Sequence, residues 1–439
     1  MDTTNNNAAR SSCVQQTNRQ AEPLLLPKPI AVDLTPSSLN GKRAGMVVFS
    51  PYPMDPRPRR AAEALIREGM SVDLVCEGDG KMPGREKLDA LEVIRIPIKR
   101  RRGGPLSYAW QYAMFILGST IIFGWRALKH RYDLIYVHNM PDVLVISALI
   151  PKVLGAKVIL DQHDPMPELV STIFGLRHDS LGVRVAKRLE KWSVARANLV
   201  ITVNHACKRI FVSRSCQPTK IGVVMNTPDE AIFAFRPPQL GGRRNRASSA
   251  HFVVMYHGSL VARNGLEIAV DAMQLLRSRI PWAELRIYGH KTPFLDKVMQ
   301  SVRDRALDKC IHYLGPMRLE ELVDAIGDCD VGVIPNPRTA FTEINTPTRI
   351  FEYLALGKPV IAPRTPGIED YFDPDSLLFF DPGNAIDLAQ RLESSCHRND
   401  EVKEIVRRGQ CVYLAHTWRQ ERQVLVKMVR DLLEGGKTN

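Results

Sequence analysis

Short runs of apolar, often β-branched residues alternate with longer amphipathic segments along most of the chain after Ala44. The first series of runs is GMVVFS, SVDLVC, LEVIRIPI, YDLIYVHN, AKVILDQHD, NLVITVN and IGVVMN. A second series is HFVVMYHGSL, AELRIYGH, CIHYLG, DVGVIPN, KPVIAP and LLFF. This alternation is typical of parallel strands joined by crossover helices. We therefore expect an α/β protein with two doubly wound, Rossmann-like units that face each other across a cleft.

The 439 residues are enough for two domains with large cores. A polar start, residues 1–40, predicts a disordered tail without the apolar stretch of a signal peptide. Residues 41–233 form the first predicted unit, in which one helix should run from near Arg60 to Gly69. The Pro-, Gly- and Arg-rich segment 234–250 predicts a linker. The second unit is expected at 251–405, and a helical segment at 406–439 should pack across both units.

The segment 106–125, LSYAWQYAMFILGSTIIFGW, contains no charged residue and follows the basic run Lys99–Arg102. Its length approaches that of a membrane span. A buried crossover helix is the preferred interpretation, because the strand series needs a crossover at this place. A helix that partly faces an anionic bilayer and a true membrane span are the alternatives.

The formal net charge of +13 predicts an anionic partner. Nucleic acid is not expected, because the chain lacks interleaved aromatic residues and any recognisable nucleic-acid-binding module. Neither the eight cysteines nor the histidines show metal-ligand spacing. The triplets at 328–330 (DCD) and 373–375 (DPD) are explained by capping and turn roles. We therefore expect no metal and no secretory signal. The protein should be cytoplasmic, either free or peripheral on the inner face of the cell membrane.

One stretch, NTPTRIFEYLALGKPVIAP at 345–363, predicts a helix that starts at a strand end. Thr346 can cap this helix, Pro347 suits its first position and Gly357 ends it. The free N–H groups of such a helix end favour phosphate. Arg349 and Glu352 share one face, so the cation could contact a diphosphate while the carboxylate binds a ribose. The alternative is a surface salt bridge between the two.

A second candidate group follows the strands of the first unit. The strand in LDQHDPMPEL ends at His163, with Asp164 and Glu168 close behind, and the preceding strand ends at His138 and Asn139. His163 could bind a sugar or orient an acceptor hydroxyl, or it could be a structural histidine. Asp164 and Glu168 could equally be charges at a helix N-terminus.

PTRIFEYLALGKPVIAP resembles the donor-site motif of the retaining glycosyltransferases of family 4, the glycosyl transferases group 1, which have the GT-B fold. YHGSLVARNGLEIAVDAM and RIYGH resemble the family's C-terminal strands and glycine turns. DPRPRRAAEALIREGMSVDLVC, the stretch from VHNMP to DPMPEL, and VITVNHACKRIF resemble the N-terminal half of a bacterial branch. These stretches cover most of residues 44–420.

The resemblance implies specific roles at matching positions. Glu352 would bind the nucleotide ribose, the helix start would receive the diphosphate, and Arg263 would neutralise the leaving diphosphate. The implied donor-binding set is Gly258, Ser259, Arg263, Gly289, Thr346, Thr348, Arg349 and Glu352. His163 and Arg263 would be catalytic. The acceptor-side candidates, chosen from their positions at the strand ends, are His138, Asn139, Asp164 and Glu168. The chain departs from the family pattern at Ser259, Asn264 and Ile344, where the family has an Arg, a Lys and a Glu; the nearest carboxylate to the last is Glu343.

The function that the resemblance implies is metal-independent and cofactor-free transfer of a sugar from a nucleotide diphosphate donor, with retention of configuration. The acceptor would be a glycan or a lipid-linked hydroxyl, as in polysaccharide or glycoconjugate biosynthesis. One alternative is a nucleotide-sugar epimerase on the same fold. Another is a catalytically inactive nucleotide-sugar-binding module, which detectable donor turnover would exclude.

Overall fold

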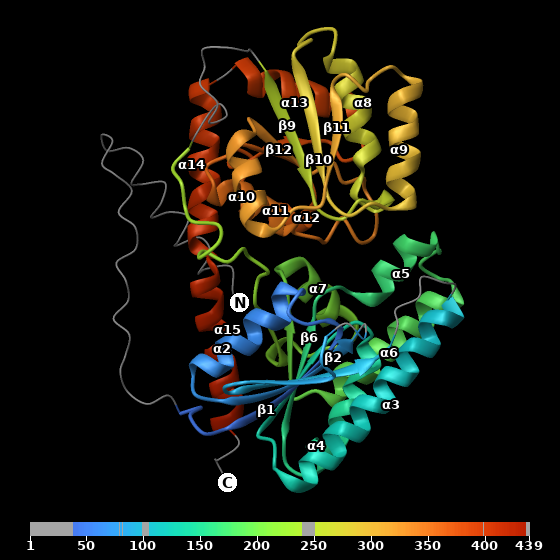
Figure 1. Cartoon of the computed structure of the whole chain (residues 1–439), viewed down its shortest axis with the longest axis vertical. Helices are drawn as coiled ribbons and strands as arrows, with labels where there is room; N and C mark the ends of the chain where they lie inside the picture. Colours follow the sequence, from blue (N-terminus) through green and yellow to red (C-terminus); the bar gives the residue numbers. More distant parts are fainter. Residues whose placement is uncertain are drawn as a thin grey trace. The chain divides into compact units, whose positions relative to one another are not determined.

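The computed structural model describes residues 38–78, 80, 82–98, 105–238, 251–397 and 399–435 (Figure 1). The chain divides into two compact units. One contains the described residues up to Asn226 together with those from Glu421 onward, and the other is Thr227–Gln420. Most of the predicted tail, most of the predicted linker and the basic run Lys99–Arg102 lie outside the described residues.

The first unit contains an eight-stranded sheet in the order β3-β4-β2-β1-β5-β6-β7-β8, parallel throughout except for the β3–β4 pair. Its strands are β1 (Arg43–Pro51), β2 (Ser71–Gly78), β3 (Arg85–Leu88), β4 (Leu91–Pro97), β5 (Leu134–His138), β6 (Lys157–Gln162), β7 (Leu199–Thr202) and β8 (Ile221–Val223). The seven predicted runs are all strands. β3 was not predicted, because its sequence, REKL, has no β-branched residue and is held by pairing with β4.

The helices of this unit are α2 (Pro56–Arg67), α3 (Pro105–Lys129), α4 (Leu149–Val153), α5 (Met166–Phe174), α6 (Leu181–Arg196) and α7 (His205–Arg214), with 3-10 turns η1 (Asp142–Ala148) and η2 (Pro218–Lys220). The predicted start of α2 near Arg60 is wrong. The helix begins at Pro56, because the Asp55 side chain caps it by accepting a hydrogen bond from the Arg57 N–H at 3.2 Å.

α3 is the crossover helix between β4 and β5, as preferred from the sequence. One face is buried: Phe115 and Phe123 are fully covered, and the Ser119 hydroxyl bonds that of Ser147 in η1 at 2.6 Å. At the other end Arg126 pairs with Asp73 at 3.0 Å and Glu92 at 2.8 Å, which fixes α3 to β2 and β4. No helix within the described residues is long and apolar enough to cross a membrane.

The second unit contains a parallel sheet in the order β11-β10-β9-β12-β13-β14. Its strands are β9 (Phe252–His257), β10 (Ala283–Tyr288), β11 (Ile311–Gly315), β12 (Val331–Val333), β13 (Val360–Pro363) and β14 (Leu378–Phe380). Each lies within a predicted run. This strand order is the doubly wound order of dinucleotide-binding folds, so both predicted Rossmann-like units are confirmed.

The helices of the second unit are α8 (Leu266–Leu276), α9 (Pro293–Asp304), α10 (Leu319–Asp328), α11 (Thr348–Ala355), α12 (Pro366–Glu369), α13 (Ala385–His397) and α14 (Asn399–Ala415), with 3-10 turn η3 (Ala262–Asn264). Apolar side chains of α8, α9 and α13 pack with β9, β10 and β12 in one core. The C-terminal segment forms two helices, α14 and α15 (Trp418–Glu434), separated at His416–Thr417. Within the first unit, Glu421 of α15 accepts a hydrogen bond from the Met225 N–H at 2.7 Å.

Candidate functional site

In each sheet the strand order reverses between two neighbouring strands, and ligands of doubly wound folds bind beyond the carboxyl ends of the strands at that point. In the second unit the reversal lies between β9 and β12. His257 is the last residue of β9, and Gly258 follows it. We call His257, Gly258, Gly289, Arg349 and Glu352 the β9–α11 group, because each contacts the end of β9.

Arg349 and Glu352 of α11 both bind His257. The Arg349 guanidinium donates to the His257 carbonyl at 2.7 Å and lies 4.8 Å from the centre of the Tyr256 ring. Glu352 Oε2 is 2.6 Å from His257 Nε2. Among the described residues Arg349 and Glu352 form no ion pair with each other, so the surface salt bridge considered above is wrong. The three-residue spacing lets both side chains reach one strand end.

His257 also contacts the next residue of α11. Its Nδ1 atom is 2.8 Å from the Tyr353 hydroxyl, which donates to the Met255 carbonyl at 2.9 Å. Because the Tyr353 hydroxyl donates its proton to Met255, it accepts a hydrogen bond from His257 Nδ1, while His257 Nε2 pairs with the Glu352 carboxylate. The His257 side chain is 5% exposed and that of Glu352 is 15% exposed. Within the described residues only Oε2 of Glu352 is engaged, so Oε1 is available to a ligand.

The turns after β9 and β10 bring backbone close to this group. The Gly258 N–H donates to the Tyr288 carbonyl at 3.1 Å, and the Gly289 N–H donates to Gly315 at 3.0 Å. Gly289 has φ +151°, and a Cβ there would overlap the Gly258 carbonyl oxygen. Only glycine permits this approach of two backbone segments.

Ser259, Arg263 and Asn264 lie in the turn between β9 and α8. Asn264 does not supply a charge: its side-chain amide donates to the Ser259 carbonyl at 2.8 Å and closes the turn. Arg263 lies in η3, half-buried, with its guanidinium 6.0 Å from the Phe341 ring centre. Within the described residues no hydrogen bond or ion pair engages that guanidinium. Arg263 is therefore the cation of this turn that is free to meet an anion.

The helix start differs by one residue from the prediction. α11 begins at Thr348 with Pro347 as its N-cap, so Thr346 lies one position before the cap rather than at it. The Thr346 hydroxyl donates to the Gly367 carbonyl at 2.6 Å. Thr348 is the first helical residue, where backbone N–H groups have no partner within the helix.

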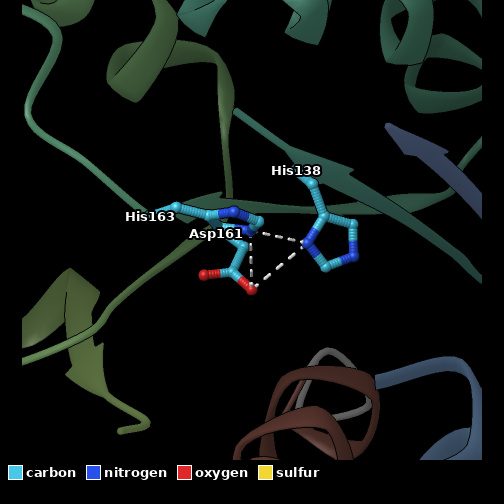
Figure 2. A group of neighbouring side chains, drawn as sticks. All are labelled: His138, Asp161 and His163. Carbon is cyan, nitrogen blue, oxygen red and sulfur yellow. Dashed lines mark hydrogen bonds and ion pairs between the residues drawn. The ribbon is translucent and has the colours of Figure 1, made fainter. Parts of the chain in front are cut away.

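The first unit gathers a second set of polar residues at the ends of β5 and β6, beside the point between β1 and β5 where its own strand order reverses. His138 ends β5, Asp161 lies on β6 and His163 follows that strand (Figure 2). His138 Nδ1 is 2.9 Å from His163 Nε2 and 3.4 Å from Asp161 Oδ2, while His163 Nε2 is 3.7 Å from that oxygen. We call these three residues, with Asn139, the β5–β6 group.

The three converging ligand atoms of His138, Asp161 and His163 form the one grouping of metal-ligand side chains in the described part of the chain. Arg57 of α2 already binds Asp161, with Nη2 2.7 Å from Oδ1 and Nε 3.1 Å from Oδ2. The Tyr136 hydroxyl donates to the same carboxylate at 3.0 Å. A divalent cation here would lie beside a buried guanidinium, so we interpret the group as a hydrogen-bonded network and not as a metal site.

Burial lowers the pKa of His163 to about 4, against the opposing effect of the Asp161 carboxylate. Arg57 and the two histidines hold the pKa of Asp161 far below its usual range despite its burial. His163 is therefore a neutral imidazole at neutral pH. It can exchange a hydrogen bond with a hydroxyl group, but it is not a general acid there.

Asn139 fixes the loops around His163. Its side-chain oxygen accepts from the His163 N–H at 2.7 Å, and its NH₂ donates to the Asp164 carbonyl at 2.9 Å. The same NH₂ group lies 3.0 Å from Asp142 Oδ1. Glu168 does not join this group: its carboxylate is buried and binds Arg214 through two hydrogen bonds, at 2.6 and 2.8 Å.

Sequence reasoning missed His257, Arg57 and Asp161. His257 directly precedes Gly258, and Asp161 lies two residues before His163, on the same face of an extended strand. The sequence therefore offered a signal for His257 and for Asp161, because each lies within two residues of a residue that was named as a candidate. Arg57 was hidden in a run of arginines, because its role depends on a contact 104 residues away.

Two protein-family models match the chain. The model described as a glycosyl transferase 4-like domain matches residues 54–227, and the model of the glycosyl transferases group 1 matches residues 251–397. Together they cover most of both units and every residue of the β9–α11 and β5–β6 groups.

Two curated proteins are similar in sequence. A probable glycosyltransferase, WbjE of Pseudomonas aeruginosa, is 23% identical over 252 residues, which are 54% of this chain and 59% of that protein. The gpi3 subunit of phosphatidylinositol N-acetylglucosaminyltransferase from Schizosaccharomyces pombe is 21% identical over 278 residues, 62% of this chain and 55% of that protein. The match thus spans between half and three-fifths of each relative.

Solved structures show the same fold. Sucrose-phosphate synthase from Thermosynechococcus elongatus has a TM-score of 0.72 at 18% identity, covering 90% of this chain and 100% of that one. HepE of Anabaena, in complex with UDP-glucose, has a TM-score of 0.65 at 18% identity, covering 88% and 99%. A trehalose 6-phosphate synthase from Burkholderia multivorans has a TM-score of 0.68 at 14% identity, covering 90% and 98%.

Proposed function

Because the chain belongs to the family 4 glycosyltransferases of group 1, which have the GT-B fold, we propose that it transfers a sugar from a nucleoside diphosphate donor to a hydroxyl group. The observation that carries this proposal is the β9–α11 group. Glu352 presents a free carboxylate oxygen beside a helix N-terminus, at the strand end where doubly wound folds bind nucleotides. That oxygen would accept a hydrogen bond from the ribose.

Uracil is the proposed base of the donor nucleotide. HepE of Anabaena, which shares the fold, has been solved with UDP and with UDP-glucose. The family 4 resemblance further implies that the anomeric configuration of the sugar is retained. No contact in the described residues selects one sugar, so glucose is only the first candidate to test.

Charge that develops on the leaving diphosphate would be stabilised by Arg263 and by the N–H groups at the start of α11. Arg349 supports the same end of β9 through the His257 carbonyl and adds a positive charge there. The leaving phosphate oxygen would take the proton of the acceptor hydroxyl, so the reaction needs no side-chain base. His163, as a neutral imidazole, would bind a sugar or acceptor hydroxyl, with His138 and Asn139 holding it in place.

The proposed acceptor is a glycan or a lipid-linked hydroxyl, used by a cytoplasmic enzyme on the inner face of the cell membrane. The relative from Schizosaccharomyces pombe is a subunit of phosphatidylinositol N-acetylglucosaminyltransferase, which supports the lipid-linked choice. Polysaccharide or glycoconjugate biosynthesis is the corresponding pathway class.

The test is a panel of nucleotides and nucleotide sugars, read by thermal stabilisation and by release of the free nucleoside diphosphate. We expect UDP and one or more UDP-sugars to stabilise the protein, and UDP to be released once a suitable acceptor is added. Arg263→Ala should slow UDP release and also weaken UDP binding, because UDP carries the diphosphate charge that Arg263 would neutralise. Stabilisation without turnover for any acceptor would instead support the inactive module, and no stabilisation by any nucleotide would refute the proposal.

A further inference from the structure

α3 exposes a continuous apolar stripe on the side that faces away from the sheet. Six large side chains, between 40% and 75% exposed, follow one another at intervals of three or four residues, which places them on one helix face. They are Trp110, Met114, Leu117, Ile121, Trp125 and Leu128. No acidic residue occurs in this helix. An exposed apolar patch of this length indicates an interaction surface.

α6 extends the same kind of surface. α3 and α6 both pack against η1, and Figure 1 shows them as long helices of the first unit. Leu181, Val185 and Leu189 of α6 are 69%, 43% and 44% exposed and recur at intervals of four. We call the exposed faces of α3 and α6 the α3–α6 surface.

The charges beside these apolar residues are almost all positive. The exposed charged residues of α6 are Arg184, Arg188, Lys191 and Arg196, whereas its single acid, Glu190, is buried against Arg214. At the end of α3, the Lys129 ammonium lies 3.7 Å from the centre of the Trp125 ring. Among the described residues from 105 to 196, Asp179 is the only exposed carboxylate, and it pairs with Arg177 at 3.2 Å.

We propose that the α3–α6 surface binds an anionic lipid bilayer from one side, without crossing it. Apolar side chains with tryptophans among them enter the interface of a bilayer, and neighbouring cations bind its anionic headgroups. A second copy of the chain fits less well, because a two-fold contact would oppose like charges. The proposal of bilayer binding is supported by these two helices alone. The further step, that it brings the enzyme to a lipid-linked acceptor, rests on the proposed function.

The experiment is co-sedimentation of the whole protein with vesicles of phosphatidylcholine, with and without phosphatidylglycerol. Leu117→Gln, Ile121→Gln and Leu128→Gln, combined, remove part of the stripe. The matched control changes three exposed leucines of the other unit, Leu275, Leu314 and Leu319, to Gln. A charge variant combines Arg184→Gln, Arg188→Gln and Lys191→Gln, with Lys297→Gln, Arg303→Gln and Lys309→Gln as its control.

We expect the wild-type protein and both controls to bind vesicles that contain phosphatidylglycerol. The stripe variant should bind at least about tenfold more weakly, and the charge variant should lose the preference for phosphatidylglycerol. The proposal is overturned if the wild-type protein ignores these vesicles, or if the controls lose binding as much as the variants. It is equally overturned if light scattering shows that the stripe variant only dissociates a dimer.

UDP stabilisation is measured in parallel on every variant. The surface substitutions should leave it unchanged, since they lie in exposed positions outside the β9–α11 group. A wild-type protein that binds vesicles but no nucleotide would contradict the proposed function and leave the bilayer proposal standing. A wild-type protein that binds nucleotide but no vesicles would overturn the bilayer proposal and leave the proposed function standing.

Discussion

His257 connects the two α11 side chains on which the proposed donor site depends. Its carbonyl accepts from Arg349 and its ring binds Glu352, so this one residue fixes both a cation and a carboxylate at the end of β9. The ring does not need to touch the nucleotide for this role. It is a positioning residue for Glu352, and it was not among the residues predicted from the sequence.

The role of His257 can be separated from its contribution to folding. We expect His257→Ala to weaken UDP binding about tenfold, because Glu352 loses a charge-assisted hydrogen bond worth about 1.5–3 kcal/mol and its fixed orientation. Tyr353→Phe is the control, since it removes the other partner of the ring but keeps the bond to Glu352. Calorimetric titration with UDP measures both variants. Equal losses of affinity in the two would contradict the positioning role.

The buried carboxyl group of Asp142 should make the free energy of unfolding depend on pH. Burial raises the pKa of this carboxyl from 3.8 to about 7, although the Asn139 hydrogen bond opposes the shift. Between these two values the folded chain holds a proton that the unfolded chain has lost. This contribution to stability is therefore complete below about pH 4 and is lost as pH rises through about 7.

Asp142→Asn should remove this dependence while keeping an oxygen that accepts from Asn139. We expect the free energy of unfolding of the wild-type protein, relative to the variant, to fall by at most about 1.4 kcal/mol per pH unit across that range. Urea unfolding at several pH values measures the difference. Parallel profiles for the two proteins would show that Asp142 is already ionised in the folded state.

At the scale of elements, the turn between β9 and α8 sets the position of Arg263. Gly265 closes this turn with φ +69°, and a Cβ there would overlap the carbonyl oxygen of Pro335. Gly383 has a similar φ of +87° but no heavy atom within 4 Å of a Cβ. The two glycines of the same unit thus share the backbone conformation and differ in the available space.

We expect Gly383→Ala to cost about 1–2 kcal/mol, the penalty of the left-handed conformation alone. Gly265→Ala should cost at least twice as much, because the turn must move away from Pro335 as well. Thermal unfolding followed by circular dichroism compares them. If the two substitutions lower the midpoint equally, the turn has room that the structure does not show.

The elements that the sequence predicted well are those whose signal is local. Every predicted strand is present, because buried parallel strands are runs of apolar residues whatever surrounds them. β3 was missed because its charged sequence depends on its partner strand. The N-terminus of α11 was misplaced by one residue, because Pro347 is compatible with either the cap or the first turn.

Site residues were predictable where a motif fixed their positions. They were not predictable where contacts with residues distant in the sequence determine their roles. Glu352 and Arg349 were named from their spacing, whereas their common partner on β9 lies more than ninety residues earlier. Glu168 looked like a residue of the β5–β6 group, but Arg214 binds it from another helix. A single sequence does not reveal such pairs, because side-chain charge gives no indication of the partner.

At the scale of the whole molecule, the chain repeats one plan in two units. Each unit is doubly wound, and each places polar residues at strand ends at or beside the point where its strand order reverses. The β9–α11 group carries the nucleotide proposal, and the β5–β6 group offers a neutral histidine fixed by hydrogen bonds. The exposed cations of α6 account for part of the positive net charge. The nucleotide site alone does not require these cations.

The central claim is that Glu352 of the β9–α11 group binds the ribose of a uridine nucleotide. Calorimetric titration of the whole protein with UDP tests it, with Glu352→Gln beside the wild type and Glu369→Gln, an exposed carboxylate of α12, as the control. We predict that the wild type and the control bind UDP alike and that Glu352→Gln binds at least about tenfold more weakly. Equal affinity in all three proteins, or no binding by the wild type, would contradict the account.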